Sequence, residues 1–325
     1  MTPPAPSPPL VERFRADTAR AAGEEIARLG LAVSGGPDSV AMLLLSAAAF
    51  PGRVSAATVD HGLRPENAYE AAWVGTLCHG LGVPHIILGP VKQMRESGGV
   101  QAQARALRYH LLAGWARDEG CGHVATAHHA DDQADTLMLR LARGSGLPGL
   151  AGIRRRRPIE EGDAIMLIRP CLDWRREELA AVVATAGIAA VDDPSNRAPR
   201  FDRSRIRAWL AAPDAPPAVR IGAAANHLAD CEAALAWAAD AAWNERATEG
   251  EALVLNVEGL PREIRRRLVK RAIDALRETP AAPWREDGVN RLLATLEGGG
   301  RATLAGVVAT GGAPWRLRRA PPRRL

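Results

Sequence analysis

The chain of 325 residues has few cysteines, few aromatic residues and almost no lysine. Aromatic residues make up only 4% of it, which argues against an all-β sandwich. The cysteines never form a C-x-x-C pair, and this argues against a disulfide framework, a zinc site and dithiol redox chemistry. The four cysteines are Cys78, Cys121, Cys171 and Cys231.

Long apolar runs are also missing. No apolar stretch reaches 18 residues without charges, so we expect no membrane span. Residues 1–9 are proline-rich and have neither a basic region nor an apolar core, so they do not resemble a signal peptide. We expect residues 1–25 to form a disordered or variable leader, and the protein to be cytoplasmic.

Arginine replaces lysine almost completely, because only Lys92 and Lys270 occur among the 42 basic residues. The abundance of alanine, glycine and proline favours a GC-rich coding bias as the reason. The net charge of +5 suits a polyanionic partner such as RNA, although this modest excess does not identify one.

Short apolar runs alternate with helical patterns through the first two-thirds of the chain. This alternation predicts an α/β domain over residues 26–212, with a doubly wound parallel sheet that binds ligands at the carboxyl ends of its strands. The expected strands cover residues 31–33, 54–59, 85–88, 123–127 and 165–168. The expected helices cover residues 38–49, 66–81, 101–118, 131–142 and 174–187.

A second domain is expected because the chain is longer than one typical domain. The alanine- and proline-rich residues 211–217 indicate a linker. Beyond it we expect an alanine-rich helix at 218–247, a short strand near 252–257 and an arginine-rich helix at 259–277. Residues 218–325 are therefore predicted to form a smaller, mainly helical domain.

The most informative segment, residues 34–39, reads Ser-Gly-Gly-Pro-Asp-Ser and lies between an expected strand and a buried helix. Backbone N–H groups of such a loop and the following helix N-terminus form a phosphate pocket. The loop lacks the Gly-Lys-Ser/Thr ending of a P-loop and carries Asp38 where that loop has lysine. A carboxylate facing phosphates needs a cation between them, which implies Mg²⁺. The alternative is an ordinary Gly-Gly turn.

Polar clusters also follow two other strands. Asp60 and His61 follow the second strand, either as a capped turn or as part of the nucleotide site. His128 ends the fourth strand, and Asp132 and Asp135 then lie at i and i+3 on one helix face. Helix capping explains one acid in a first turn, but not two histidines with three acids. Such a cluster can hold Mg²⁺, orient an amine or accept its proton.

Two arginine-rich stretches are candidates for binding anions. Arg105 and Arg108 lie with Tyr109 on adjacent faces of one helix, where an arginine could neutralise a triphosphate. The alternative is a solvated basic face. Residues 192–207 begin with Asp-Asp-Pro-Ser-Asn and end in closely spaced arginines, and they could form a linker helix, cover the nucleotide or contact RNA.

Together these motifs resemble those of the tRNA(Ile)-lysidine synthase family, in the N-type ATP pyrophosphatase, or PP-loop, superfamily. The loop at 34–39 alone resembles only the superfamily, and the resemblance covers about residues 29–210. The further motifs that carry it are His-Gly-Leu-Arg at 61–64, Gln-Ala-Arg-x-x-Arg-Tyr at 103–109, Ala-His-His-x-Asp-Asp-Gln at 127–133, Arg-Gly-Ser-Gly-x-x-Gly-Leu at 143–150, Ile-Arg-Pro at 168–170 and Asp-Asp-Pro-Ser-Asn at 192–196.

The resemblance implies an adenine nucleotide α-hydrolase-like sheet and a tRNA-binding second domain. It implies that ATP, with Mg²⁺, adenylates the C2 oxygen of cytidine 34 in the CAU anticodon of tRNA(Ile). The ε-amine of free L-lysine then displaces AMP and forms lysidine, so the products include AMP and pyrophosphate. A homodimer is one possible assembly, and the sequence does not decide the oligomeric state.

The resemblance also implies roles for individual residues, with Asp38 as the metal ligand. The implied catalytic residues are Asp38, Arg105, His128, Asp132 and Asp135. The implied ATP-binding residues are Ser34, Gly35, Gly36, Pro37, Asp38, Ser39, Asp60 and His61. The candidate RNA-binding residues are Arg203, Arg205, Arg265, Arg266 and Arg267.

Two positions depart from the family pattern. Asp135 stands where glutamate is usual, so the charge is kept with a shorter reach. Ser204 stands where many relatives have asparagine, which puts a polar contact in doubt. The alternatives are a thiolase of the same superfamily, which needs a cysteine pair or an iron–sulfur cluster, a small-molecule synthetase, and a non-catalytic nucleotide- or RNA-binding module.

Overall fold

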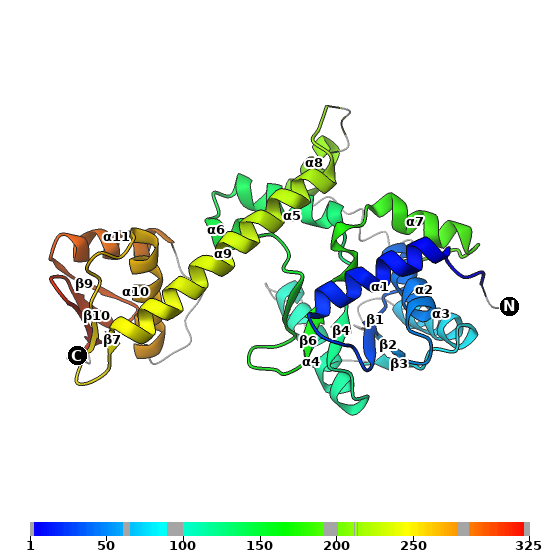
Figure 1. Ribbon diagram of the computed structural model, residues 1–325, viewed down its shortest axis with the longest axis horizontal. Coiled ribbons are helices and arrows are strands. Elements are labelled where there is room, and N and C mark those ends of the chain that lie inside the picture. Colours follow the sequence, from blue (N-terminus) through cyan, green and yellow to red (C-terminus); the bar gives the residue numbers. More distant parts are fainter. Residues whose placement is uncertain are drawn as a thin grey trace. The chain divides into compact units, whose positions relative to one another are not determined.

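The computed structural model describes residues 3–60, 66–89, 100–191, 201–210, 212, 214–277 and 286–321. The chain forms two compact units, residues 1–229 and 230–325, which are described separately (Figure 1). None of the helices in these ranges has the length and apolarity that a bilayer crossing requires.

The first unit is built on a six-stranded sheet with the order β3-β2-β1-β4-β6-β5. All neighbours pair in parallel except β5 and β6, so the predicted parallel, doubly wound sheet is confirmed. The strands are β1 (Leu29–Ala32), β2 (Val54–Val59), β3 (His85–Leu88), β4 (His123–Ala125), β5 (Arg156–Pro158) and β6 (Met166–Ile168).

Helices cover both faces of this sheet, as a doubly wound fold requires. One face packs with α1, α2, α3 and α7 around a core that includes Phe14, Leu43 and Trp174. The other face packs with α4 through Leu112 and Trp115. The helices of this unit are α1 (Pro8–Ala22), α2 (Pro37–Ala49), α3 (Glu66–Gly80), α4 (Val100–Asp118), α5 (Ala130–Ala142), α6 (Leu147–Leu150), the 3-10 helix η1 (Pro170–Asp173), α7 (Arg176–Thr185) and α8 (Phe201–Leu210).

The disorder predicted for the leader is wrong for residues 8–22, which form α1. Val11, Phe14, Thr18 and Ala21 recur at helical spacing and are buried against the sheet-covering helices. Gly23 ends the helix at a φ of 72°, where glycine is favoured. The polar residues between these apolar ones hid the pattern in the sequence.

The edge strand β5 and the helix α6 were not predicted, whereas α8 falls where a linker helix was one of the alternatives. The β5 residues Arg-Arg-Pro have no apolar alternation, and two of its three side chains are exposed. This strand lies at the sheet edge and is held by its backbone pairing with β6, not by burial of its side chains.

The second unit combines helices with a five-stranded antiparallel sheet of order β7-β8-β11-β10-β9. Its sheet is more extensive than the short strand and strand-like tail we expected, although more residues are helical than extended. The elements are α9 (Ala218–Arg246), which crosses the boundary between the units, α10 (Arg262–Leu276), α11 (Glu286–Glu297), β7 (Ala247–Thr248), β8 (Leu253–Leu255), β9 (Arg301–Leu304), β10 (Val307–Thr310) and β11 (Trp315–Arg319).

Candidate active site

The loops that follow β1 and β4 define the candidate site. These strands are neighbours, and the chain turns from β1 toward β2 but from β4 toward β6, so they flank the topological switch point of the sheet. Ligands of open α/β sheets bind in the crevice at such a point, beyond the carboxyl ends of the strands. The fold therefore brings the glycine-rich loop and the histidine–aspartate cluster to the same edge.

The loop after β1 is held by its two serines. The backbone N–H of Ser34 donates to Oγ of Ser39 at 3.2 Å, and this hydroxyl donates to the carbonyl of Gly36 at 2.9 Å. Gly36 caps α2, whose first turn carries Asp38. Gly35 has a φ of 88°, and an added Cβ would lie 3.3 Å from a methyl group of Val74, so this position favours glycine. The loop thus presents the α2 N-terminus to the site.

Asp38 faces the cluster after β4 through His129. Nε2 of the buried His129 lies 3.5 Å from Oδ2 of Asp38 and 3.6 Å from Oδ2 of Asp132. Nδ1 of the same ring lies 3.5 Å from Oδ2 of Asp131. The structure therefore joins the two predicted motifs through a histidine that the sequence-based choice of site residues omitted.

The two adjacent histidines have opposite electrostatic environments. Burial lowers the pKa of His129, but Asp131, Asp38 and Asp132 outweigh that effect and raise this pKa to about 10. Burial and the positive charge of Arg169 lower the pKa of His128 to about 4. At neutral pH His129 is a cation between carboxylates, whereas His128 is neutral and hydrogen-bonds Oγ1 of Thr126 at 3.0 Å.

The start of α5 is fixed to its surroundings by backbone contacts. The N–H of Ala130 donates to the carbonyl of Trp174 at 2.9 Å, and the N–H of Arg176 donates to Oδ2 of Asp131 at the same distance. Asp132 accepts the backbone N–H of His129 at 3.2 Å. Asp131 and Asp132 thus cap helices and also hold the His129 ring.

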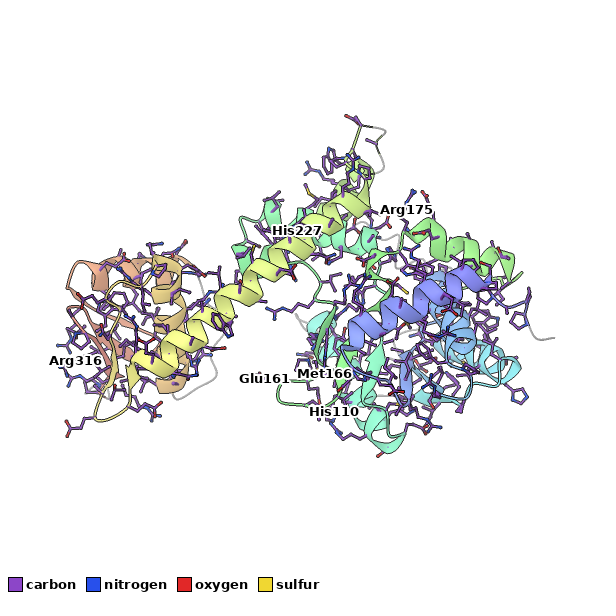
Figure 2. The ribbon with its side chains drawn as sticks, viewed as in Figure 1. His110, Glu161, Met166, Arg175, His227 and Arg316 are labelled. Atoms are coloured by element: carbon purple, nitrogen blue, oxygen red, sulfur yellow. The ribbon has the colours of Figure 1, made fainter. Side chains whose placement is uncertain are left out.

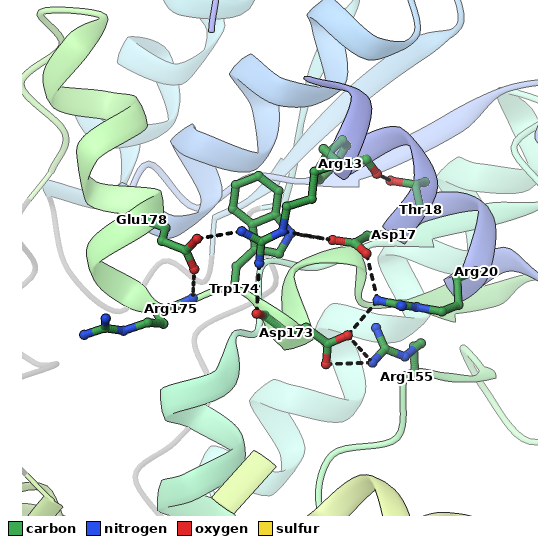
Figure 3. A network of polar contacts seen from close by, with 10 residues as sticks. Arg13, Asp17, Thr18, Arg20, Arg155, Asp173, Trp174, Arg175 and Glu178 are labelled. Carbon is green, nitrogen blue, oxygen red and sulfur yellow. Dashed lines mark hydrogen bonds and ion pairs between the residues drawn. The ribbon is translucent and has the colours of Figure 1, made fainter. Parts of the chain in front are cut away.

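A network of polar contacts supports the segment that carries Trp174 (Figure 3). The indole N–H of the fully buried Trp174 donates to Oδ2 of Asp17 at 2.8 Å, which ties this segment to α1. The Arg13 guanidinium lies 4.2 Å from the indole ring centroid and pairs with Glu178 at 2.6 Å. Because Trp174 also binds the start of α5, helix α1 contributes to the position of the active-site cluster.

Asp135, which the sequence analysis grouped with Asp132, is 4% exposed and paired with Arg207 of α8. Nε of Arg207 donates to Oδ2 of Asp135 at 2.5 Å. Asp132 is more open, with 28% of its side chain exposed. Of the two predicted carboxylates, Asp132 is therefore the more accessible to a ligand.

Removing Arg207 should destabilise the first unit because it leaves the buried Asp135 without this partner. We expect Arg207→Ala to lower the free energy of unfolding by about 1–3 kcal/mol. The loss should lie near the lower value, because the Arg207 side chain is half-exposed. Urea unfolding of Arg207→Ala, Asp135→Asn and the double variant measures this. The double variant should lose clearly less than the two single losses added together, and full additivity would contradict a direct pair.

Arginines also gather around Tyr109 of α4. The guanidinium carbons of Arg105 and Arg157 lie 5.2 and 4.8 Å from the centroid of its ring. Arg169, directly after β6, also interacts with Tyr109, and burial lowers its pKa to about 10, so it stays protonated. Arg105 and Arg169 lie close enough to His128 to lower its pKa. The site therefore has an acidic side and a cationic side.

Of the other predicted site residues, Asp60 follows β2, the parallel neighbour of β1, and its N–H donates to the carbonyl of Leu88 at 2.9 Å. His61 and the side chain of Arg203 lie outside the described residues, whereas Arg205 is exposed on α8. The α10 residues Arg265, Arg266 and Arg267 lie in the second unit.

Those three α10 arginines are engaged within the protein. Arg265 pairs with Glu297 at 3.8 Å, Arg266 with Glu263 at 2.7 Å, and Arg267 with the buried Glu232 at 2.6 Å. Their side chains are 30%, 13% and 15% exposed. These ion pairs indicate a structural contribution, and RNA binding by these residues stays a prediction.

Comparison with known proteins agrees with this geometry. The PP-loop domain family model matches residues 11–212. A tRNA(Ile)-lysidine synthase of Zymomonas mobilis is 46% identical over 301 residues, which cover 91% of this chain and 90% of the relative. This chain belongs to the tRNA(Ile)-lysidine synthase family. As a member it is an enzyme, a ligase that modifies tRNA and uses ATP in its PP-loop domain.

Other comparisons support the same assignment. A tRNA(Ile)-lysidine synthase of Novosphingobium aromaticivorans is also 46% identical, over 96% of this chain and 94% of the relative. Among solved structures, a U34-tRNA thiolase from Methanococcus maripaludis matches with a TM-score of 0.53. It has 16% sequence identity and covers 68% of this chain and 80% of that chain, so it supports the fold alone.

Proposed function

We propose that this protein joins the ε-amine of free L-lysine to C2 of cytidine 34 in the CAU anticodon of tRNA(Ile). In the first step the C2 oxygen attacks the α-phosphate of ATP and pyrophosphate leaves. In the second step the amine attacks C2, loses a proton, and AMP leaves with the oxygen. The observation that carries this proposal is the contact of Asp38, in the phosphate loop, with the His129 cluster.

The loop residues 34–39 fit the phosphates of ATP, and Asp38 fits a magnesium ion. Oδ1 of Asp38 is buried and has no hydrogen-bond partner among the described residues, so it is available to a cation. Mg²⁺ is usually held by one or two carboxylates together with substrate phosphates, where it neutralises their charge. His129, a cation at this point, limits repulsion between Asp38 and Asp132.

The arginines near Tyr109 and the carboxylates after β4 have different roles in this proposal. Arg105, with Arg157 and Arg169 nearby, stabilises the negative charge that develops as pyrophosphate or AMP leaves. Asp132 binds an ammonium group of lysine, and the buried Asp135 adds negative charge on the same helix. A protonated amine cannot attack, so a base is needed. The base is a carboxylate of the cluster or His128. His128 is neutral but its low pKa makes it a weak base, and His129 already carries a proton.

The stoichiometry of nucleotide release tests this chemistry. We expect AMP and pyrophosphate in equal amounts, in a reaction that requires both the tRNA(Ile) transcript and lysine. Quantifying nucleotides after omission of each component measures the dependence. Release of ADP, or AMP formation that ignores RNA, would contradict the proposal.

A thiolase reaction would require reactive sulfur, and the cysteines disfavour it. Burial raises the pKa of Cys78 to about 12, that of Cys121 to about 11, and that of Cys171 further. Thiols with raised pKa values are poor nucleophiles at neutral pH. Only Cys231 is exposed.

A thiol titration separates the two chemistries. We expect a disulfide reagent to modify one thiol rapidly in the native protein and the other three only on unfolding. Cys231→Ser should remove the rapid phase and leave AMP release unchanged. Several rapidly reacting thiols, or loss of AMP release with Cys231→Ser, would favour sulfur chemistry.

The proposed substrates, tRNA and ATP, also support a cytoplasmic location.

A further inference from the structure

The sheet of the second unit has one apolar face and one cationic face. Along β11 the side chains alternate, with Trp315 and Leu317 buried and Arg316 and Arg318 exposed. The buried face packs with α10 and α11. Figure 2 labels Arg316 on this unit. The opposite face therefore presents arginines to the surroundings.

Strand register brings three arginines together on that face. Thr310 pairs with both Arg301 of β9 and Arg316 of β11, so these two arginines point to the same side, two strands apart. Arg318 lies two residues farther along β11 and points the same way. With strands about 4.8 Å apart and residues rising about 3.4 Å each, the three Cα atoms lie within roughly 12 Å. We call Arg301, Arg316 and Arg318 the arginine face.

The charge of the arginine face is not neutralised within the described part of the chain. None of the five strands of this sheet contains an aspartate or glutamate. No ion pair or hydrogen bond engages the three guanidinium groups there, and all three residues are exposed. Helix α10 differs, since its arginines pair with Glu297, Glu263, Glu232 and Asp240. The arginine face thus carries positive charge that no described acid neutralises.

We propose that the arginine face binds the phosphate backbone of tRNA. This inference rests on the proposed function, which makes tRNA the substrate, and names the surface that holds it. Guanidinium groups bind phosphate oxygens in bidentate fashion, and a flat row of them suits a backbone. Phosphate contacts carry no sequence information, so this face contributes affinity and orientation, not the choice of anticodon.

The test compares two triple variants with equal loss of charge. Arg301→Gln, Arg316→Gln and Arg318→Gln together remove the arginine face. Arg262→Gln, Arg271→Gln and Arg277→Gln form the control, because each of these arginines pairs with an acid in the same unit. Binding of a tRNA(Ile) transcript is measured by fluorescence anisotropy from 50 to 300 mM salt, after circular dichroism has verified folding.

We expect the face variant to bind about 10²-fold more weakly near 0.1 M salt, with the slope of log K against log salt concentration reduced by about 2–3. The control should change the slope by less than about one. Replacing the same three residues with lysine should restore most of the slope, because the charge is kept. The face variant should weaken binding of another tRNA by the same factor.

An unchanged slope in the face variant, or equal losses in both triple variants, would overturn the assignment. Lysidine formation by the wild type is measured alongside at saturating tRNA. If the wild type forms lysidine while the face variant binds normally, only this inference fails. If the wild type neither binds tRNA nor forms lysidine, the proposed function fails with it.

Discussion

Asp38→Asn is expected to lower tRNA-dependent AMP release by about 10³-fold while the protein stays folded. The asparagine keeps the shape of the side chain but loses the charge that a cation needs beside the phosphates of ATP. Oδ1 of Asp38 is buried without a hydrogen-bond partner in the part of the chain that the structure describes. Since Oδ2 of Asp38 contacts His129, Oδ1 is the oxygen left for a cation. Single-turnover AMP formation at saturating ATP measures the effect.

Asp131→Asn is the matched control, because Asp131 also contacts His129 but lies outside the phosphate loop. Its second contact, the backbone N–H of Arg176, can be kept by the amide oxygen of asparagine. We expect this variant to lose about 10-fold or less, through weaker positioning of His129. Equal losses in the two variants would indicate that Asp38 acts only by holding His129.

Trp174→Ala is expected to reduce the free energy of unfolding by about 3–5 kcal/mol, the usual cost of emptying a large buried aromatic site. Trp174 is 0% exposed and packs edge-on against Phe14, with ring centroids 6.4 Å apart. Its carbonyl also holds the N–H of Ala130 at the start of α5. The variant should therefore lose activity as well as stability. Urea unfolding followed by circular dichroism gives the stability.

Trp174→Phe separates packing from the hydrogen bond. Phenylalanine keeps a ring in the site but cannot donate to Asp17, so we expect a loss of about 1–2 kcal/mol. The carboxylate of Asp17 keeps its contact with Arg20 at 2.7 Å, which limits the penalty. If both variants lost the same free energy of unfolding, packing of the aromatic ring would not be what stabilises this site.

Much of the first unit could be predicted because most of its strands are short apolar runs, including the partly exposed β3. The predicted bounds of β2 and β3 agree with the structure residue for residue, since each apolar run ends at a clear polar or turn residue. Helix α1 was missed because Arg13, Asp17 and Arg20 interrupt its apolar positions. Their partners lie between residues 173 and 178. Those pairings depend on residues about 150 positions away.

The site was predictable in its motifs but not in its pairings. Asp38 and the cluster after β4 were expected to meet, because parallel strands end at one edge. Which of the two adjacent histidines contacts Asp38 depends on the extended backbone of His129, with φ −129° and ψ −179°, and no local pattern indicates this. The motif Ala-His-His-x-Asp-Asp-Gln did contain the signal, since it includes both histidines. Likewise, composition made Arg265–Arg267 an RNA candidate, whereas their acidic partners became apparent only in the fold.

Transfer of labelled lysine to tRNA shows whether this protein forms lysidine. Purified protein is incubated with ATP, Mg²⁺, radiolabelled lysine and a tRNA(Ile) transcript bearing CAU, beside a transcript with uridine at position 34. We expect label in the CAU transcript alone, with one AMP released for each lysine incorporated. The Asp38→Asn variant should incorporate no label. Label in both transcripts, or AMP release without any label in RNA, would contradict it.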